Sequence, residues 1–496
     1  MAANIYLPVR IFSTRTSILS LYTILVFVFA SCMFHPYTWQ GTNPPGHNKA
    51  SFKGFSGKNT NSVEVTKGNL LLVSYNIRVT QGTLLFSIEN KGNKLFQKSF
   101  SAQADSAELK FSANETGVYK IAVQGKNATG SFDINYKAEA PKKIAVKTNK
   151  YIELFGLMLQ LDNGPDFLGN NDTVLIDNKK VTWRNWYALA VKNYLRYKQF
   201  DSCTMMTAYR RLLSRGLYND FFVGFLLQVD EVPFAKINAG TDKETIMAFS
   251  KKGDVEEAKK NAAEFLDSFN SFYKETNFEN YLNENKNYYE LIKADVEKNL
   301  PNEYFLPTME NFYQKQFNAY CLVPSLNILT SMGFGKMNRN TQTIYNTFGP
   351  FSFQVFDSKN LDLGFDFPER ICGLSVHEFG HSFVNPAIDK VPKVLIDSTE
   401  YLFTPIKSAM SKLAYPAWKM CLYEHFVKAG EVIIARKLGD TKQAEKILQD
   451  NVKAKFIYLP TIVEELEKYD KNKNVYKSYD DFVPLVIEKL KIAYKE

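Results

Sequence analysis

The stretch Pro368–Pro386, PERICGLSVHEFGHSFVNP, carries the strongest signal in the chain because it contains the motif HExxH. On a helix, positions i and i+4 lie on one face, so the imidazoles of His377 and His381 can reach one metal ion. Glu378 is then placed beside the open coordination position, where it can take a proton from metal-bound water and pass it to a leaving amine. The uncharged residues around the motif predict a buried helix that spans the stretch and ends at its last two residues, Asn-Pro.

Zinc suits this pair of histidines because it binds imidazole well, has no redox chemistry and lowers the pKa of bound water toward neutrality. We therefore predict Zn²⁺-dependent hydrolysis of peptide bonds, with His377 and His381 as metal ligands and Glu378 as general base and acid. A pair of structural histidines, or a site that has lost its activity, is the competing interpretation.

The motif resembles that of the zincin metallopeptidases. More narrowly, residues from about 320 to 490 resemble a domain-of-unknown-function family of exported bacterial proteins presumed to be peptidases. The blocks that carry this resemblance are HEFGHSFVNP, AYPAWKMCLYEHFVKA at 414–429 and YDDFVPLVIEKL at 479–490. The resemblance implies a zincin-like catalytic domain and a peptidase activity, but no particular substrate.

A third protein ligand has to come from elsewhere in the chain. The metzincin arrangement is excluded, since Val384 and Ala387 stand where that class needs glycine and histidine. Glu400 follows His381 by 19 residues, which is close to the spacing in several glutamate-zincins. However, Glu400 has no helical apolar stripe around it, and Pro405 interrupts the chain soon afterwards.

Glu424 is the stronger candidate for the third ligand. Its helical neighbours are apolar, namely Ala417, Met420, Cys421 and Val427. A carboxylate on a buried stripe needs a cation to offset its desolvation. Glu424 also matches the glutamate of the pattern E-x-x-V-[KR]-A in the family that the chain resembles. Three other residues remain alternatives, Glu400, His425 and Glu431, and a surface ion pair of Glu424 with Lys428 would need no metal.

The N-terminus predicts export. Arg10 and Arg15 precede an uncharged run, Ile18–Ala30, which is too short for a membrane span and suits a signal sequence. Small residues directly before Cys32 resemble a bacterial lipobox, so we expect a lipoprotein-type signal peptide at 1–31 and a lipid anchor on Cys32. A plain signal peptide is the alternative. Both predict a protein of the bacterial cell envelope, in the periplasm or at the cell surface.

The rest of the chain predicts a multidomain protein, with an all-β sandwich followed by a mostly α (α+β) zincin-like domain. Residues 32–60 are rich in Gly, Pro and Asn and predict a tether. Period-2 alternation predicts the sandwich at 61–138, and a linker follows at 139–150. We expect residues 151–496 to form one mostly helical domain with a small sheet. Its clearest predicted helices are 254–273, 408–437, 442–455 and 476–494.

Two features near the motif are weaker. The strand-like residues 351–356 are candidates for the edge strand on which zincins align an extended substrate, although a plain hairpin fits equally well. Tyr415 and Tyr423 are both candidates to stabilise an oxyanion.

Composition limits the partners of the protein. The chain is 45% hydrophobic and 23% charged, with a net charge of +9, but it has no Lys/Arg-rich block. We therefore expect no nucleic-acid partner, and we expect a protein or peptide substrate together with a membrane contact through the lipid anchor. The competing function is a non-catalytic surface protein that binds a glycan or a partner through the β-sandwich, with a structural or vestigial metal site.

Overall fold

The structure is a computed structural model that describes residues 38–140, 142–176, 179–473, 475–476 and 478–494. The expected signal peptide and the expected lipid anchor on Cys32 lie outside the described residues. The chain divides into two compact units, of which the first ends at Ala140 and the second begins at Pro141. None of the described helices is both long enough and apolar enough to span a membrane.

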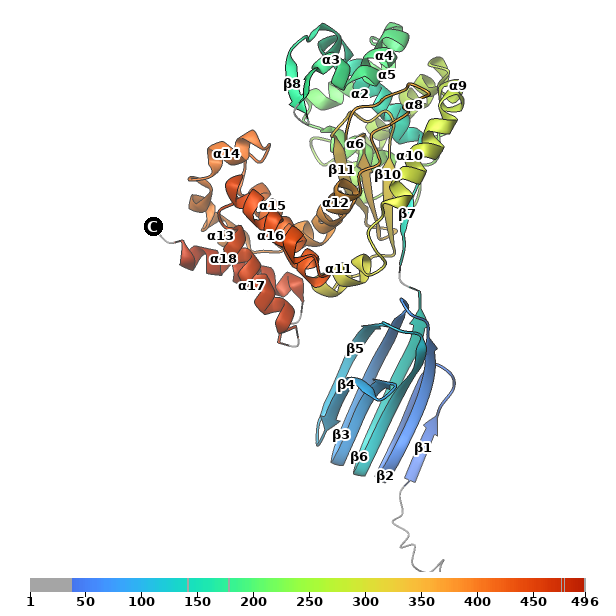
Figure 1. The fold of residues 1–496 in the computed structure, drawn as a ribbon, viewed down its shortest axis with the longest axis vertical. Coiled ribbons are helices and arrows are strands. Elements are labelled where there is room, and N and C mark those ends of the chain that lie inside the picture. Colours follow the sequence, from blue (N-terminus) through green and yellow to red (C-terminus); the bar gives the residue numbers. More distant parts are fainter. Residues whose placement is uncertain (1–37, 141, 177–178, 474, 477, 495–496) are drawn as a thin grey trace, which may run out of the picture. The chain divides into compact units, whose positions relative to one another are not determined.

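The first unit is built from long antiparallel strands (Figure 1). They are β1 (Thr38–Thr42), β2 (His47–Val65), β3 (Leu70–Asn90), β4 (Asn93–Phe100), β5 (Ala104–Ser112) and β6 (Gly117–Glu139). Their order in the sheet is β1-β2-β6-β3-β4, and β5 also pairs with β3. The β-rich N-terminal region that the alternation predicted is therefore confirmed.

The sheet folds back on itself. The rings of Tyr75 and Phe86 lie 5.2 Å apart although both belong to β3, whereas eleven residues of straight strand would span about 36 Å. The bend falls at a register irregularity between Val79 and Thr83. Gly82 has φ +69° there, and a Cβ at this position would overlap with the backbone of Asn127. The two layers of the unit are thus halves of one bent sheet.

The expected tether at 32–60 differs from the structure over its described part. Residues 38–42 form β1, and β2 begins at His47. Within β2 the apolar residues Ala50, Phe52 and Phe55 are buried. Packing of these few apolar side chains outweighs the polar, glycine-rich composition that predicted a tether.

The second unit contains a mixed sheet of four strands, β7 (Ile144–Val146), β10 (Ala319–Pro324), β11 (Gly333–Asn338) and β12 (Thr343–Phe348). The order is β11-β12-β10-β7. β10 runs parallel to β7 and β12, and β11 is an antiparallel edge strand. Part of the expected linker at 139–150 therefore belongs to this sheet as β7. A separate hairpin pairs β8 (Thr173–Ile176) with β9 (Lys179–Thr182).

In sequence, the helices of this unit lie between β7 and β10 and after β12. Before β10 come α2 (Lys150–Gly169), α3 (Trp183–Trp186), α4 (Ala188–Tyr197), α5 (Thr204–Ser214), α6 (Asn219–Leu226), α7 (Lys243–Met247), α8 (Val255–Glu275), α9 (Phe278–Glu284), α10 (Lys286–Lys298) and α11 (Phe305–Tyr313). After β12 come α12 (Pro368–Asp389), α13 (Lys393–Asp397), α14 (Lys407–Lys412), α15 (Trp418–Lys437), α16 (Thr441–Lys453), α17 (Leu459–Lys471) and α18 (Tyr479–Ala493).

The mostly helical character of this region is confirmed, but helix ends depend on packing. α8 begins where the sequence predicts, because the side chain of Asp254 accepts a hydrogen bond from the N–H of Glu257. The expected end of the motif helix at Asn385-Pro386 is wrong, since α12 continues through Pro386 to Asp389. Ala387 and Ile388 in this last turn are buried, and their burial compensates for the hydrogen bond that proline removes.

The sheet of the second unit is covered on both faces. Tyr320, Leu322 and Ile344 pack into a core with α12, α15, α17 and α18. Cys321, Val323 and Phe334 belong to a second core with α2, α5, α6 and α8. As Figure 1 shows, α12 contacts β11 and α15, so the motif helix lies between the sheet and the C-terminal helices. The four cysteines of the described residues, Cys203, Cys321, Cys372 and Cys421, are all free.

Candidate metal centre

The two motif histidines and one glutamate converge from two helices. The Nε2 atoms of His377 and His381, one turn apart on α12, are 3.3 Å from each other. From α15, the carboxylate of Glu424 places Oε1 3.3 Å from Nε2 of His381 and Oε2 3.7 Å from Nε2 of His377. Ligands about 2.1 Å from a tetrahedral zinc ion are about 3.4 Å from one another. The three groups therefore already have the separations of a zinc site.

Among the described residues, His377, His381 and Glu424 are the group whose ligand atoms come close enough to hold one metal ion. Glu424 is 7% exposed, and its Oε2 atom accepts no hydrogen bond. A buried carboxylate oxygen without a partner is costly unless a cation lies beside it. This orphaned oxygen is the observation within the site that indicates a metal ion.

Both histidines are oriented through their other ring nitrogen. Nδ1 of His377 lies 2.6 Å from Oε1 of Glu431, and Nδ1 of His381 lies 3.1 Å from Oδ1 of Asn385. Oxygen acceptors at these positions require a proton on Nδ1, which leaves the Nε2 lone pair of a neutral imidazole free for a metal. Glu431 follows Glu424 by seven residues, and Asn385 follows His381 by four. Both spacings repeat one helix face, and this is the sequence signal that could have identified the two orienting residues.

The alternatives for the third ligand lie elsewhere. Glu400 is exposed at the start of a 3₁₀ turn, Glu400–Phe403, and is not part of the converging group. His425 is completely buried against the rings of Phe456 and Tyr458, and its Nδ1 donates to the backbone oxygen of Cys421. Glu431 contacts the outer nitrogen of His377 and not its metal-facing nitrogen. Of the four candidates, the geometry favours Glu424.

Glu378 and one of the two candidate tyrosines lie near this group. Glu378 is half-buried and lies against Gly335 of β11. The pKa of Tyr415 is raised, first by burial and then by the negative charge of the nearby Glu424. The hydroxyl of Tyr423 instead donates to Asp389 at the end of α12. Tyr415 is therefore the tyrosine that the fold brings to the site.

The expected substrate strand at 351–356 is wrong. These residues form only one isolated bridge, between Val355 and Asp362. The edge strand beside the motif helix is β11, which lies upstream of it in sequence. Its glycines, Gly333 and Gly335, offered no apolar alternation, so the period-2 pattern did not identify this strand.

When no metal is bound, the negative charges at the site favour a protonated His377. Burial disfavours the charged form of His377, but the hydrogen bond and negative charge of Glu431, together with Glu378 and Glu424, raise its pKa to about 9. Burial also opposes the charged form of Glu424, while the two histidines lower its pKa. Below about pH 9 the metal-free site thus holds a protonated His377, which zinc has to displace.

This proton predicts how the stability of the metal-free protein depends on pH. A folded-state pKa of about 9, against 6.5 for the free side chain, contributes stability that is complete below pH 6.5 and is lost as the pH rises to 9. We expect the free energy of unfolding to fall over this interval by up to about 3 kcal/mol. Denaturant unfolding of chelator-treated protein at pH 6.5, 7.5 and 9 measures it.

Glu431→Gln is the matched variant, because it removes the charge that raises the pKa of His377. Burial raises the pKa of Glu153 to about 8. In both proteins, this residue therefore also makes the free energy of unfolding fall as the pH rises. The prediction therefore concerns the difference between them, and equal slopes in wild type and variant would contradict it.

Comparison with known proteins identifies a family and no activity. No curated protein is significantly similar to the chain in sequence. Solved structures that resemble part of it include a CBM4 structure, at 8% identity over 20% of this chain and 77% of that chain, with a TM-score of 0.16. The CBM22-1 xylan-binding domain of Paenibacillus barcinonensis Xyn10C matches at 9% identity over 21% of this chain and 81% of that one, with a TM-score of 0.15. TmCBM61 in complex with β-1,4-galactotriose matches at 14% identity over 23% and 93%, with a TM-score of 0.15.

Likenesses at these TM-scores carry no conclusion about this chain. The family match is different, because it covers well over half of the sequence. Residues 144–489, which include α12, α15 and the whole converging group, match the family described as a domain of unknown function, DUF4932. The chain belongs to the DUF4932 family.

Proposed function

We propose that this protein is a zinc metallopeptidase. The observation that carries the proposal is the convergence of His377, His381 and Glu424 at the mutual separations of a tetrahedral zinc site. A zinc ion held there would supply a water of lowered pKa and polarise a peptide carbonyl. The three ligand groups around it, two imidazoles and one carboxylate, fit zinc better than a hard cation such as Mg²⁺ or Ca²⁺, which prefers oxygen ligands throughout.

Glu378 is the residue that moves protons in this proposal. It neighbours His377 on the same helix, and its charge contributes to the raised pKa of that histidine, so its carboxylate lies close to the ligands. It is placed to accept a proton from the attacking water and to deliver it to the leaving amine. Tyr415, close to Glu424 and Glu378, is placed to donate a hydrogen bond to the carbonyl oxygen as negative charge develops on it.

The edge strand β11 offers a place for an extended substrate. Gly349 N–H donates to Met332 O, and antiparallel strands alternate between bonded and non-bonded pairs. Phe334, Lys336 and Asn338 therefore bond to β12, whereas the N–H and C=O groups of Gly333, Gly335 and Met337 point away from it. Among the described residues, no hydrogen bond reaches these outward groups. An unpaired edge of this kind can bind a peptide backbone as an additional strand.

Replacement of Gly335 by alanine tests this arrangement. A Cβ at this position would overlap with Oε2 of Glu378, so the variant should displace the proposed base. We expect kcat/KM for an unstructured protein substrate to fall by about 100-fold, with zinc content unchanged. Hydrolysis by zinc-loaded protein, with and without chelator, measures the effect.

Gly333→Ala is the control on the same face of the same strand. The nearest atom to its Cβ, the oxygen of Thr347, would be 3.6 Å away, so this variant should retain activity. Equal activity in the two variants would remove the proposed role of β11. An inactive wild type that nonetheless binds zinc would count against peptide hydrolysis itself.

We propose the cell envelope as the place of action and a protein or peptide as the substrate. The location is supported by the signal-like residues 1–31 and by Cys32, the candidate for lipid attachment. The absence of any Lys/Arg-rich block supports a partner other than nucleic acid.

A further inference from the structure

The loop between β10 and β11 is buried, which is unusual for a connection between strands. Residues 325–330 are all buried, and Ser325 and Asn327 have no exposed surface. Most loops run over the surface because buried backbone groups need hydrogen-bond partners. This loop therefore depends on partners supplied by the surrounding helices.

Glu153 of α2 supplies the first of these partners. Its carboxylate, which is 1% exposed, accepts hydrogen bonds from the backbone N–H groups of Leu326 at 3.0 Å and Asn327 at 3.2 Å. Gly156 lets the loop pass close to α2, since a Cβ there would overlap with the backbone of Asn327. The helix and the loop are thus built for close contact at Asn327.

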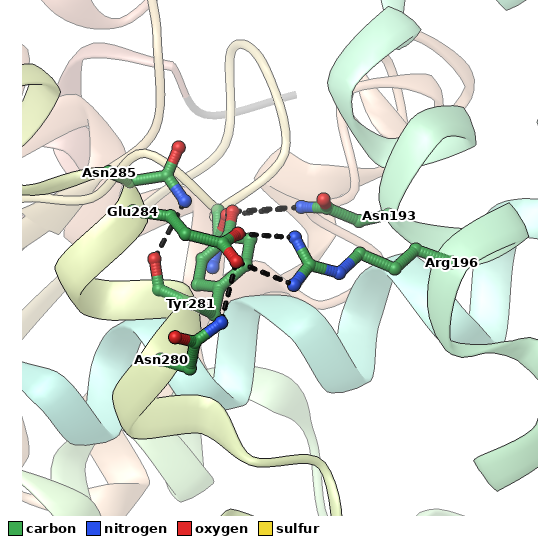
Figure 2. Close-up of polar contacts among 7 residues, drawn as sticks. Asn193, Arg196, Asn280, Tyr281, Glu284 and Asn285 are labelled. Carbon is green, nitrogen blue, oxygen red and sulfur yellow. Dashed lines mark hydrogen bonds and ion pairs between the residues drawn. The ribbon is translucent and has the colours of Figure 1, made fainter.

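The side chain of Asn327 is bonded to the helices around it. Its Nδ2 donates to the backbone oxygen of Glu153 at 3.1 Å, and its Oδ1 accepts from the hydroxyl of Tyr281 on α9 at 2.6 Å. Asn193 of α4 donates to the Tyr281 hydroxyl at 3.0 Å, as Figure 2 shows, and to Oε1 of Gln160 at 2.7 Å. Gln160 closes the network by donating to the backbone oxygen of Asn327 at 2.8 Å.

The loop leads directly into the edge strand. Gly349 N–H donates to Met332 O at 2.9 Å, which pairs the last residue before β11 with the first residue after β12. Three residues further along, Gly335 lies against Glu378. Because peptide units are rigid and the path from Asn327 to Gly335 is short, a shift of the loop changes the position of β11 beside Glu378.

Helices α4 and α9, which Asn193 and Tyr281 join inside the protein, are also joined by a second set of contacts on the solvent side. Arg196 of α4 binds Glu284 of α9 through two nitrogens, at 2.6 and 3.2 Å, and Asn280 donates to the same carboxylate (Figure 2). The side chains of Arg196 and Glu284 are 43% and 45% exposed, so water and salt screen their attraction. This exposed pair provides a control for the buried network, because it links the same elements without touching the loop.

We propose that Asn327 is a positioning residue for the substrate strand: the buried amide network sets where β11 lies beside Glu378, and so where an extended substrate lies relative to the metal. The inference rests on the proposed peptidase function for its meaning in catalysis. The placement of β11 itself can be measured without any activity.

The test compares Asn327→Ala and Tyr281→Phe with the control Glu284→Gln in the full chain. Hydrogen exchange should report β11 through the N–H groups that bond to β12, those of Phe334, Lys336 and Asn338. We expect these to exchange about tenfold faster in the first two variants and at the wild-type rate in the control. With an unstructured protein substrate, kcat/KM should fall about tenfold in the first two variants and not in the control, while zinc content stays within about twofold of wild type.

Tyr281→Phe keeps the ring and removes only the hydroxyl. It therefore still tests the placement of β11 if Asn327→Ala fails to fold. Unchanged exchange of β11 in folded Tyr281→Phe overturns the inference, as does an unchanged kcat/KM in a variant whose β11 exchanges faster. Failure of the proposed function would show differently, as a wild type that hydrolyses nothing although its β11 exchange responds to the variants.

Discussion

Glu378→Gln should bind zinc as the wild type does and lose hydrolysis. Glutamine preserves the size of the side chain, and the ligands His377, His381 and Glu424 are untouched, so the metal site keeps its geometry. The amide cannot accept a proton from the attacking water, and general acid–base catalysis of this kind contributes about 10²–10⁴-fold to rates. Turnover of an unstructured protein substrate, measured beside metal content by elemental analysis, should therefore fall by about that factor.

Glu369→Gln is the control, because Glu369 is an exposed carboxylate in the first turn of the same helix. It should be indistinguishable from wild type in both measurements. If Glu378→Gln retained full turnover, Glu378 would not be the base. If wild type and Glu369→Gln both bound zinc but neither hydrolysed the substrate, the metal site would be structural. The competing function, a surface protein that binds a partner through the β unit, would then be preferred.

Glu424→Gln should lose zinc, whereas Glu400→Gln should retain it. The structure brings the carboxylate of Glu424 to within 3.3 Å of the His381 Nε2 atom, and it leaves Glu400 exposed and outside the group. An amide oxygen is a weak zinc ligand, so two imidazoles would remain to hold the ion. Zinc affinity, measured by competition with a chelator at fixed pH, should fall in the Glu424 variant and not in the Glu400 variant.

Glu431→Gln provides a graded third case. Glu431 touches His377 through Nδ1 and not through the metal-facing nitrogen, and loss of such an orienting partner typically costs about 10–100-fold in metal affinity. We therefore expect the loss to be largest for Glu424, intermediate for Glu431 and absent for Glu400. A larger loss for Glu400 than for Glu424 would show that the ligand assignment is wrong.

The sequence predicted the parts of the site that one helix contains. His377 and His381 are four residues apart, so the period of the helix alone places them on one face, with Glu378 directly beside the first of them in sequence. The start of α12 at Pro368 follows from the same local chemistry, since proline at the first helical position gives up no hydrogen bond. The period of the apolar residues along the chain also predicts strands before about residue 140 and helices after it.

Long-range features were harder to predict. Glu400 was a candidate because of its distance along the chain from His381, but sequence spacing does not report how a chain returns after a helix ends. Likewise, 351–356 has more aromatic residues than β11, yet it forms no strand. β11 is a strand because β12 pairs with it, and Gly335 is needed there because Glu378 of α12 lies against it. Neither the pairing of β11 with β12 nor the close approach of α12 produces a periodic apolar pattern in a segment of six residues.

Local sequence is therefore enough to place two imidazoles on one helix face with a carboxylate next to one of them in the chain, because residues four apart on a helix are neighbours whatever else the chain does. The contacts that depend on tertiary structure are those of Glu424 with the two histidines, of Glu431 with His377, and of Gly335 with the proposed base. Those contacts join elements far apart in the chain, and they exist because the apolar faces of α12, α15 and the sheet are buried together. The positions of the charged groups follow from that packing.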